Sequence, residues 1–346
     1  MPRIGVLRCL GAAVLFGASA PAASVLAGEM PALLLAGLLY LGAALAVLSA
    51  VLRRPPTRLA LRSGWQPLAV AVVAGGAMGP VLLVLGLARI DAATSSILLN
   101  LELVATVVLA ALVFGEHIGR RIAFAASLIT AGGVLLVWQP GGSLSVGALL
   151  VVGACACWGL DNCVTARIDH LSPETVVLAK GLVAGSVNAM LGAALASGGA
   201  GPDVSVLQVL AALAIGATGY GLSITWWVRG ARDLGAARAQ VIFATAPFIG
   251  ALTAWLVLGE SVGTAQLAAI TLAGVGVWLS FDSAHEHLHR HDPVTHEHEH
   301  VHPDDHHDHA HPEPFVGRHT HEHAHEQVLV HAHPHVPDLH HHHQHA

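Results

Sequence analysis

The feature that most constrains this chain is a series of apolar segments about as long as a membrane is thick. Runs such as "SSILLNLELVATVVLAALVF" and "FAASLITAGGVLLVW" recur with only short polar breaks. About 20 apolar residues in a helix cross the hydrocarbon core of a bilayer, and a helix satisfies its own backbone polar groups inside lipid. The sequence therefore predicts an all-α polytopic protein of the lipid bilayer, with a bacterial inner (plasma) membrane as the expected location.

Charges, prolines and glycine clusters divide the apolar part of the chain into ten predicted spans. They are residues 4–27, 31–52, 66–88, 92–114, 119–138, 145–166, 173–196, 205–228, 235–258 and 262–281. If the N-terminus is cytoplasmic, twelve arginines of this part fall in cytoplasmic segments and only Arg89 falls in an outer loop. Positive side chains collect on the cytoplasmic side of membrane proteins. We therefore expect both termini in the cytoplasm.

The two halves of the apolar part resemble each other. The segment "LARIDAATSSILLNLELVATVVLAALVFGE" aligns without gaps with "ARDLGAARAQVIFATAPFIGALTAWLVLGE", and "LFGASAPAAS" has a looser counterpart in "CWGLDNCVTA". Each half has five predicted spans, so the two copies must enter the membrane in opposite senses. Such inverted repeats are typical of alternating-access carriers, with the substrate near the midplane between the halves. We expect five-helix repeats at residues 1–140 and 141–281, followed by a tail at residues 282–346.

Two halves that each end in a Gly-Glu turn and a Gly-rich helix resemble the drug/metabolite transporter superfamily, EamA type. The resemblance covers residues 1–281 and rests on "FGASAP", "WGLDN", "FGEHIGRRIAFAASLITAGGVLLV" and "LGESVGTAQLAAITLAGVGVWLS". It implies a secondary carrier, usually an exporter, rather than an enzyme, and no cofactor or nucleic acid is expected. It leaves the substrate open, because the family moves amino acids, metabolites, drugs and ions, and some nickel and cobalt resistance exporters are placed in it. Glu116 and Glu260, in the two turns, are expected to mark helix boundaries.

Glu102 lies near the middle of the predicted fourth span. An ionised carboxylate is costly there unless it faces a partner or a wet cavity. On a helix it shares a face with Ser95 and Thr106, which gives a stripe of oxygen atoms suited to a cation or a proton. A protonated carboxyl group hydrogen-bonded between helices is the alternative. The equivalent residue of the second half is Ala246, and the adjacent Pro247 should interrupt that helix and free backbone carbonyls.

The predicted sixth span carries a second polar group. Cys157 and Asp161 are four residues apart on one helical face, and Asn162 lies on the adjoining face. A thiolate with a carboxylate suits a borderline-soft divalent metal, although a buried cysteine is also a small hydrophobic residue. Lys180, the only lysine of the chain, either snorkels to the interface or pairs with Asp161 or Glu102 as a fixed cation that a metal ion or a proton would displace. The candidate substrate pathway is Ser95, Asn100, Glu102, Thr106, Cys157, Asp161, Asn162 and Lys180.

Residues 282–346 have a different composition. They hold 24 of the 26 histidines with 12 acidic residues and no apolar periodicity, which predicts a disordered segment. The net charge of −6 divides into +4 on the first 281 residues and −10 on this tail. Imidazole is a preferred ligand of Ni, Co, Zn and Cu and is largely neutral near pH 7. The candidate metal ligands are His285, His287, His289, His291, His296, His298, His300, His302, His306, His307, His309, His311, His319, His321, His323, His325, His331, His333 and His335.

Three functions fit these observations. An exporter of divalent transition metal cations, nickel or cobalt first, would use the tail to collect ions and Glu102 or Asp161 to exchange a proton for the ion. An EamA-type exporter of amino acids or other metabolites could carry the tail as a metal sensor or buffer. A membrane-anchored metal store would not transport, and the inverted repeat with carboxylates inside the membrane favours transport over storage. The sequence leaves open whether the carrier is a homodimer and whether the tail is a solubilising or pH-responsive appendage.

Overall fold

The chain separates into two compact units in the computed structural model, Met1–Ser283 and Ala284–Ala346. The structure describes residues 2–114, 119–138, 143–165, 168, 171–197, 204–234, 242–281, 285–291, 295–301, 318–324 and 329–335. Glu116, one of the two expected boundary residues, lies outside the described residues.

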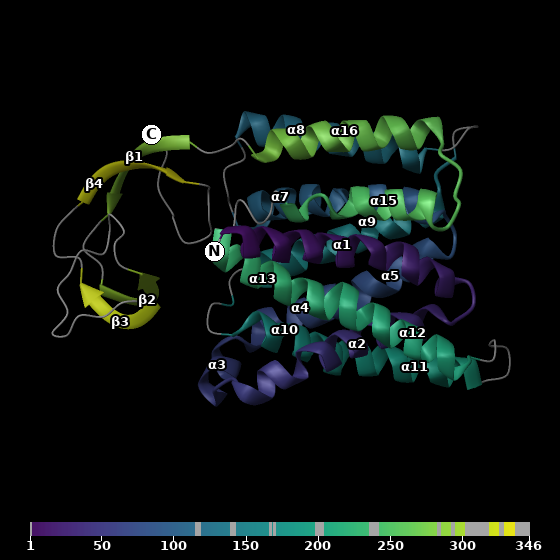
Figure 1. Cartoon of the computed structure of the whole chain (residues 1–346), viewed down its shortest axis with the longest axis horizontal. Helices are drawn as coiled ribbons and strands as arrows, with labels where there is room; N and C mark the ends of the chain where they lie inside the picture. The colour runs from purple at the N-terminus through teal and green to yellow at the C-terminus, as the bar shows by residue number, and fades with distance from the viewer. Residues whose placement is uncertain are drawn as a thin grey trace. The chain divides into compact units, whose positions relative to one another are not determined.

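The first unit consists of helices that run side by side (Figure 1). Their bounds are α1(Pro2–Ala27), α2(Ala32–Arg53), α3(Arg58–Ser63), α4(Trp65–Ala71), η1(Val72–Met78), α5(Gly79–Leu87), α6(Ala92–Leu98), α7(Leu101–Phe114), α8(Arg120–Val137), α9(Val146–Thr165), α10(Pro173–Lys180), η2(Gly181–Gly185), α11(Ser186–Ser197), α12(Val206–Gly216), η3(Ala217–Leu222), α13(Ser223–Leu234), α15(Ala246–Leu256) and α16(Thr264–Phe281).

Eight described segments are long and apolar enough to cross a membrane. They are Arg3–Ala27, Ala32–Arg53, Trp65–Leu87, Ala92–Val113, Arg120–Val137, Val146–Thr165, Pro173–Ala196 and Val206–Gly230. The predicted ninth and tenth spans contain shorter apolar helices, Ala246–Leu256 and Thr264–Leu279. Ten full-length spanning helices are therefore not confirmed. In the ninth span the reason is local, because a turn precedes α15 and shortens the helix that follows.

The fourth and ninth predicted spans are interrupted at matching places. A turn at Leu99 and Asn100 separates α6 from α7, and a turn at residues 244–245 precedes α15. The alignment of the halves pairs Glu102, in the first turn of α7, with Ala246, the first residue of α15. The interruption expected at Pro247 is thus present, and the first half has a counterpart that no proline causes. Interrupted helices at the repeat interface form the binding sites of many carriers.

Three π-helical turns, η1, η2 and η3, occur in the described part of the chain. In η1 the Gly79 N–H bonds to the carbonyl of Ala74, five residues earlier, so the Gly75 carbonyl is left for other donors. In η3 the backbone N–H of Ser223 bonds to Thr218, and the Ser223 hydroxyl donates to the Gly219 carbonyl. The gapless alignment, extended toward the N-terminus, pairs Gly75 with Gly219. The two halves therefore share a π-turn at the same place.

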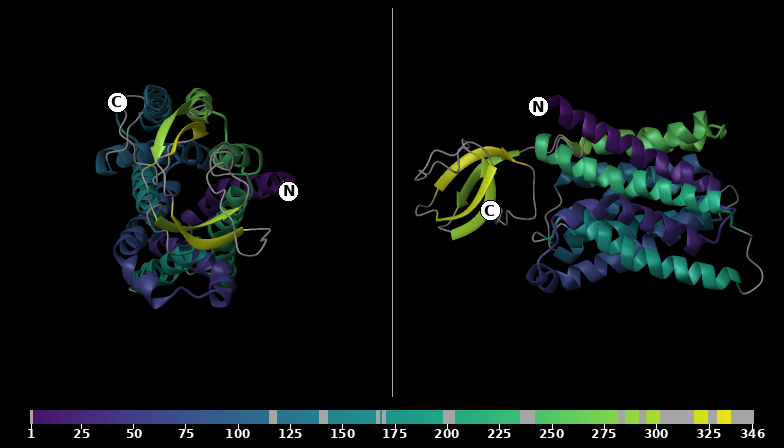
Figure 2. Two further views of the ribbon diagram at one scale, coloured as in Figure 1. Left: turned by 90° about the vertical axis from the view of Figure 1, so that its left-hand side faces the viewer. Right: turned by 60° about the horizontal axis from the view of Figure 1, so that its bottom comes forward.

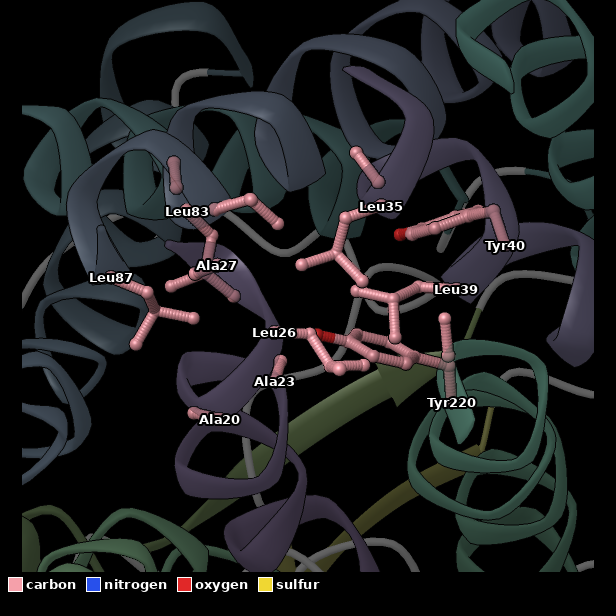
Figure 3. Packing of buried hydrophobic residues seen from close by; sticks show 14 of the residues in the cluster. Ala20, Ala23, Leu26, Ala27, Leu35, Leu39, Tyr40, Leu83, Leu87 and Tyr220 are labelled. Carbon is pink, nitrogen blue, oxygen red and sulfur yellow. The ribbon is translucent and has the colours of Figure 1, made fainter. Parts of the chain in front are cut away.

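Helix contacts also correspond between the halves, because the first helix of each half packs against helices of the other half. In the first unit α1 packs against α13 and α15, whereas α9 packs against α5 and α7, and α8 packs against α16 (Figures 1 and 2). The central core includes Leu35, Leu39 and Tyr40 of α2 near Tyr220 of η3 (Figure 3). Glycines at these contacts let the backbones approach closely, as helices in lipid require.

The second unit contains four strands, β1(His285–His291), β2(Thr295–Val301), β3(Arg318–Ala324) and β4(Leu329–His335) (Figure 1). β1 pairs with β4 and β2 with β3, both antiparallel, and the backbone register sets histidine opposite histidine, as at His287↔His333 and His298↔His321. The disorder predicted for residues 282–346 is not confirmed. The His-x-His repeat has the two-residue period of a strand. Six candidate ligands lie outside the described residues: His302, His306, His307, His309, His311 and His325.

Candidate functional site

Asp161 and Lys180 form an ion pair inside the helical unit. The Lys180 ammonium lies 2.6 Å from Asp161 Oδ2, and the two side chains are 11% and 8% exposed. The second carboxylate oxygen, Oδ1, accepts a hydrogen bond from the Thr165 hydroxyl at 3.0 Å. Asp161 lies in the last turns of α9 and Lys180 ends α10. Of the two alternatives for Lys180, snorkelling or pairing, the contacts show pairing.

Glu102 is hydrogen-bonded by a residue of α9, the helix that also carries Asp161. The amide of Asn162 donates to Glu102 Oε1 at 2.8 Å and to the Thr106 hydroxyl at 3.3 Å. Because Asp161 and Asn162 are consecutive on α9, one helix carries a partner of Glu102 and a partner of Lys180. α7, which carries Glu102, packs along α9, which carries Asp161 and Asn162. The first turn of α7 also places the Glu102 carboxylate at the positive end of a helix dipole.

The π-turn of η1 lies directly against the ion pair. The Gly75 carbonyl, which the π-turn leaves free, accepts hydrogen bonds from the Tyr40 hydroxyl at 2.6 Å and from the Trp158 indole at 3.1 Å. A Cβ atom added at Gly75 would overlap the Asp161 carboxylate and come within 2.7 Å of its Cβ. Only glycine allows this approach. Sequence reasoning missed Tyr40, whose partner is a backbone carbonyl that a regular helix would have occupied.

Aromatic rings extend from Tyr40 across the interior of the unit. Ring centroids are 5.6 Å apart for Tyr40 and Tyr220, 6.0 Å for Tyr220 and Phe16, and 5.4 Å for Phe16 and Phe243. Trp227 continues the series at 6.0 Å from Phe243. The faces of aromatic rings attract cations. These residues lie far apart in the sequence, and the local signal is limited to Tyr40 and Tyr220, which are polar aromatic residues within apolar segments.

The repeat produces this geometry a second time, between η3 of the second half and α1 of the first, without its charge. The counterpart segments "LFGASAPAAS" and "CWGLDNCVTA" pair Ser19 with Asp161. A Cβ atom added at Gly219 would meet the side chain of Ser19, just as one added at Gly75 would meet Asp161. The Ser19 hydroxyl donates to the Phe16 carbonyl at 2.6 Å. An uncharged, locally satisfied side chain therefore occupies the place that Asp161 takes in the other half.

The remaining predicted residues are not all joined to this centre. Asn100 is buried and donates to the Ile97 carbonyl at 2.9 Å, which closes the turn between α6 and α7. Ser95 is fully buried, and its hydroxyl has no hydrogen-bond partner among the described residues. Within that same part of the chain, no hydrogen bond joins Cys157 to Asp161. The neighbouring Cys155 instead donates to the Leu98 carbonyl at 3.5 Å, beside the break.

A metal-binding cluster of three or more His, Cys, Asp or Glu side chains does not occur among the described residues. The oxygen atoms that the centre offers to a cation belong to Glu102, Asp161, Asn162 and Thr106. All four lie on α7 and α9, which pack against each other.

A separate polar cluster stands at the start of α6. Both carboxylate oxygens of Glu260 accept backbone N–H groups, from Ala92 at 2.7 Å and from Ala93 at 2.8 Å. Asp91 accepts from the Gln266 amide at 2.7 Å, and these residues line a cavity of about 370 Å³. Because the carboxylates already satisfy the free N–H groups of a helix N-terminus, the contacts agree with a boundary role for Glu260.

Comparisons with known proteins agree with this arrangement. The EamA-like transporter family model matches residues 3–138 and 145–281. An uncharacterised protein of Pseudomonas aeruginosa is 30% identical over 238 residues, which is 67% of this chain and 77% of that protein. A crystal structure aligns with a TM-score of 0.54 and 22% sequence identity over 80% of this chain and 96% of its own. The structural likeness concerns the fold alone.

Proposed function

The chain belongs to the EamA-like transporter family, and on that premise we propose that it exports divalent transition metal cations, Ni²⁺ or Co²⁺ first. The family and the eight apolar segments make it an integral membrane transporter. The observation that supports a metal ion as the cargo is the composition of the tail, which holds 24 of the 26 histidines. Imidazole binds these ions preferentially, and a carrier that cleared them from the cytoplasm would gain from a ligand-rich segment.

Export would be driven by exchange of a proton for the ion at Glu102 or Asp161. A carboxyl group inside the membrane carries an uncompensated charge when its proton leaves, so a cation that takes the proton's place is held there. A proton arriving from the other side would restore the neutral acid and release the cation. Asn162, which contacts Glu102 and adjoins Asp161, would hold the carboxylate of Glu102 in position between these states.

The tail would raise the metal concentration around the carrier. Many weak ligands on one chain keep ions near without the slow release of a single tight site. The density of histidine in the tail sequence, with His-x-His repeats throughout, supports sites with several imidazole ligands. Release of metal from such sites needs only protonation or exchange of one ligand at a time.

A second candidate is export of a small organic ammonium compound, such as an amino acid or another amine, with the tail as a metal sensor or buffer. The observation that favours it is the series of rings from Tyr40 to Phe16 in a unit that also holds Glu102 and Asp161. A carboxylate with aromatic faces is the usual environment of a bound ammonium group. A metal store without transport has no support in the family to which the chain belongs.

The test is Ni²⁺ and Co²⁺ efflux from preloaded cells that express each variant at a matched membrane level. Truncation after Phe281 should raise the metal concentration for half-maximal export and leave the maximal rate nearly unchanged. Glu102→Gln should abolish export even at saturating metal, because an amide keeps the shape but can neither exchange a proton nor neutralise a cation. Glu174→Gln, a matched change in the first turn of α10, should export normally.

Two results would contradict the assignment. If truncation abolishes export while Glu102→Gln exports normally, the roles given to the tail and to the carboxylate are reversed. If the wild-type chain changes neither Ni²⁺ nor Co²⁺ efflux, the ammonium candidate takes precedence, and the same cells loaded with labelled amino acids would then show efflux that depends on Glu102.

A further inference from the structure

The ion pair bridges two helices across the π-turn of η1. Gly75 lies against Asp161 of α9, and a Cβ atom added at Gly76 would lie 3.2 Å from Lys180 Cβ of α10. The two adjacent glycines therefore form a seat in which the side chains meet from opposite sides. Both side chains are nearly buried there, at 11% and 8% exposure.

Lys180 matters for the net charge of the centre. The two carboxylates, Glu102 and Asp161, carry two negative charges when ionised, and the Lys180 ammonium carries one positive charge. The remaining negative charge is neutralised by one proton or by one monovalent cation. A divalent cation bound by the two carboxylates leaves a net charge of about +1 as long as Lys180 stays paired with Asp161. Uncompensated charge is expensive inside a membrane, so the balance discriminates between cargoes.

The repeat shows that packing alone does not require this pair. At the corresponding seat, between η3 of the second half and α1 of the first, Ser19 fills the space against Gly219 and is satisfied by the Phe16 carbonyl. A small neutral residue therefore completes the same geometry. Lys180 and Asp161 bring a charged interaction to a place where the fold does not need one.

We propose that Lys180 determines the charge of the cargo. A divalent cation is accepted only when it replaces the Lys180 ammonium on Asp161, whereas a monovalent cation replaces the proton and leaves the pair intact. The released ammonium has a four-carbon stem, which lets it withdraw toward the membrane interface. The inference rests on the proposed exchange at Glu102 and Asp161 and adds the residue that selects between the two cargo classes.

Because Lys180 is the only lysine of the chain, its release can be measured directly. The full-length protein in native membranes is treated with an amine-acylating reagent, and acylation of Lys180 is followed by mass spectrometry. Co²⁺ should raise the acylation rate at least about tenfold, since coupling energies of close buried charge pairs correspond to a factor of ten or more. Tetramethylammonium, a monovalent probe, should leave the rate unchanged.

Asp161→Asn provides the internal control. In this variant Lys180 has lost its partner, so acylation should be fast without any metal, and Co²⁺ should add nothing. If Co²⁺ raised the rate equally in this variant, binding at the tail would be the cause and the proposal would be overturned. An unchanged wild-type rate at Co²⁺ concentrations that saturate export would overturn it as well. These measurements do not require any variant of Lys180 to fold.

Transport by Lys180 variants distinguishes a role in cargo selection from a purely structural role of Lys180. A purely structural role would not change the Co²⁺ concentration for half-maximal export in the way described next. Lys180→Met should lower the Co²⁺ concentration for half-maximal export about tenfold without raising the maximal rate, because the competitor for Asp161 is gone. Lys180→Arg keeps the charge and should behave as the wild type. Equal effects of methionine and arginine would overturn the proposal. If wild-type cells export no Co²⁺ at all, the proposed metal function fails, and the acylation experiment still decides whether a divalent cation displaces Lys180.

Discussion

Gly75→Ala is the substitution for which the structure gives the sharpest expectation. The new methyl group would overlap the Asp161 carboxylate and lie 2.7 Å from Asp161 Cβ, whereas carbon atoms in contact need about 3.5 Å. Asp161 or η1 must therefore move by about 1 Å. The bond between Lys180 and Asp161 is 2.6 Å long, so a shift of that size takes the two groups out of hydrogen-bond range.

The cost follows from two terms. Overpacking of a filled interior costs about 1–3 kcal/mol, and leaving one member of a buried ion pair without its partner costs about 3–5 kcal/mol. Partial relaxation of α9 reduces the sum, so we expect a loss of about 3–5 kcal/mol. Gly274→Ala is the matched control in α16, because its Cβ would meet only Phe248 at ordinary contact distances of 3.6 Å and more. That change should cost less than about 0.5 kcal/mol.

The assay is thermal unfolding of the purified full-length protein in detergent, with apparent midpoints compared between variants and Lys180 acylation measured on the same samples. Gly75→Ala should unfold at a clearly lower temperature than Gly274→Ala and should expose Lys180. The double variant Gly75→Ala/Asp161→Ala removes the carboxylate from the overlap and leaves only the contact between the two Cβ atoms, so its loss should be smaller than the sum of the single losses. Equal midpoints for the two glycine variants, with Lys180 still protected, would refute the seat that we assign to η1.

Two further outcomes are expected. Glu260→Gln should lose one of the two acceptors that bind Ala92 and Ala93 and lower stability by about 1 kcal/mol in thermal unfolding; it should leave export unchanged, and a loss of export at full stability would contradict its boundary role. A peptide of residues 285–346 should bind several Ni²⁺ ions at pH 7.5 in calorimetry and release them as the pH falls through about 6.5, because a protonated imidazole is no ligand; equal uptake by an equally acidic peptide without histidine would remove the tail from the mechanism.

Local chemistry made some of these features predictable from the sequence. Proline lacks a backbone N–H and clashes with the preceding turn, so Pro247 predicted an interruption of its helix wherever that helix packs. A single lysine within an apolar span must either pair with an acidic residue or extend its ammonium group to the membrane interface. Asp161 was one of the two acidic partners that the sequence offered, with Glu102 as the other. The EamA resemblance was also readable, since the Gly-Glu turns and glycine-rich helices are contiguous in the chain.

Other features depend on tertiary contacts and were not predictable in the same way. The turn at Leu99 and Asn100 contains neither glycine nor proline. Its sequence signals are the turn-favouring Asn100 and, indirectly, the alignment of Glu102 with Ala246. The π-turns have no residue rule of their own. The pairing of Gly75 with Gly219 was available in the sequence, but its meaning depends on which side chains approach the two glycines.

The two halves are alike in backbone and unlike in charge, and this combination bears on how a carrier of this kind can be driven. Inverted repeats of many carriers exchange conformations between two states of similar packing, and the matched interruptions and π-turns are the features that such an exchange would use here. A ligand shifts such an equilibrium only through different interaction free energies with the two states. The neutral seat formed by Ser19 and Gly219 supplies no electrostatic difference for a cation. Under the proposed exchange we therefore expect coupling to run through α9, where Asp161 binds Lys180 and Asn162 binds Glu102.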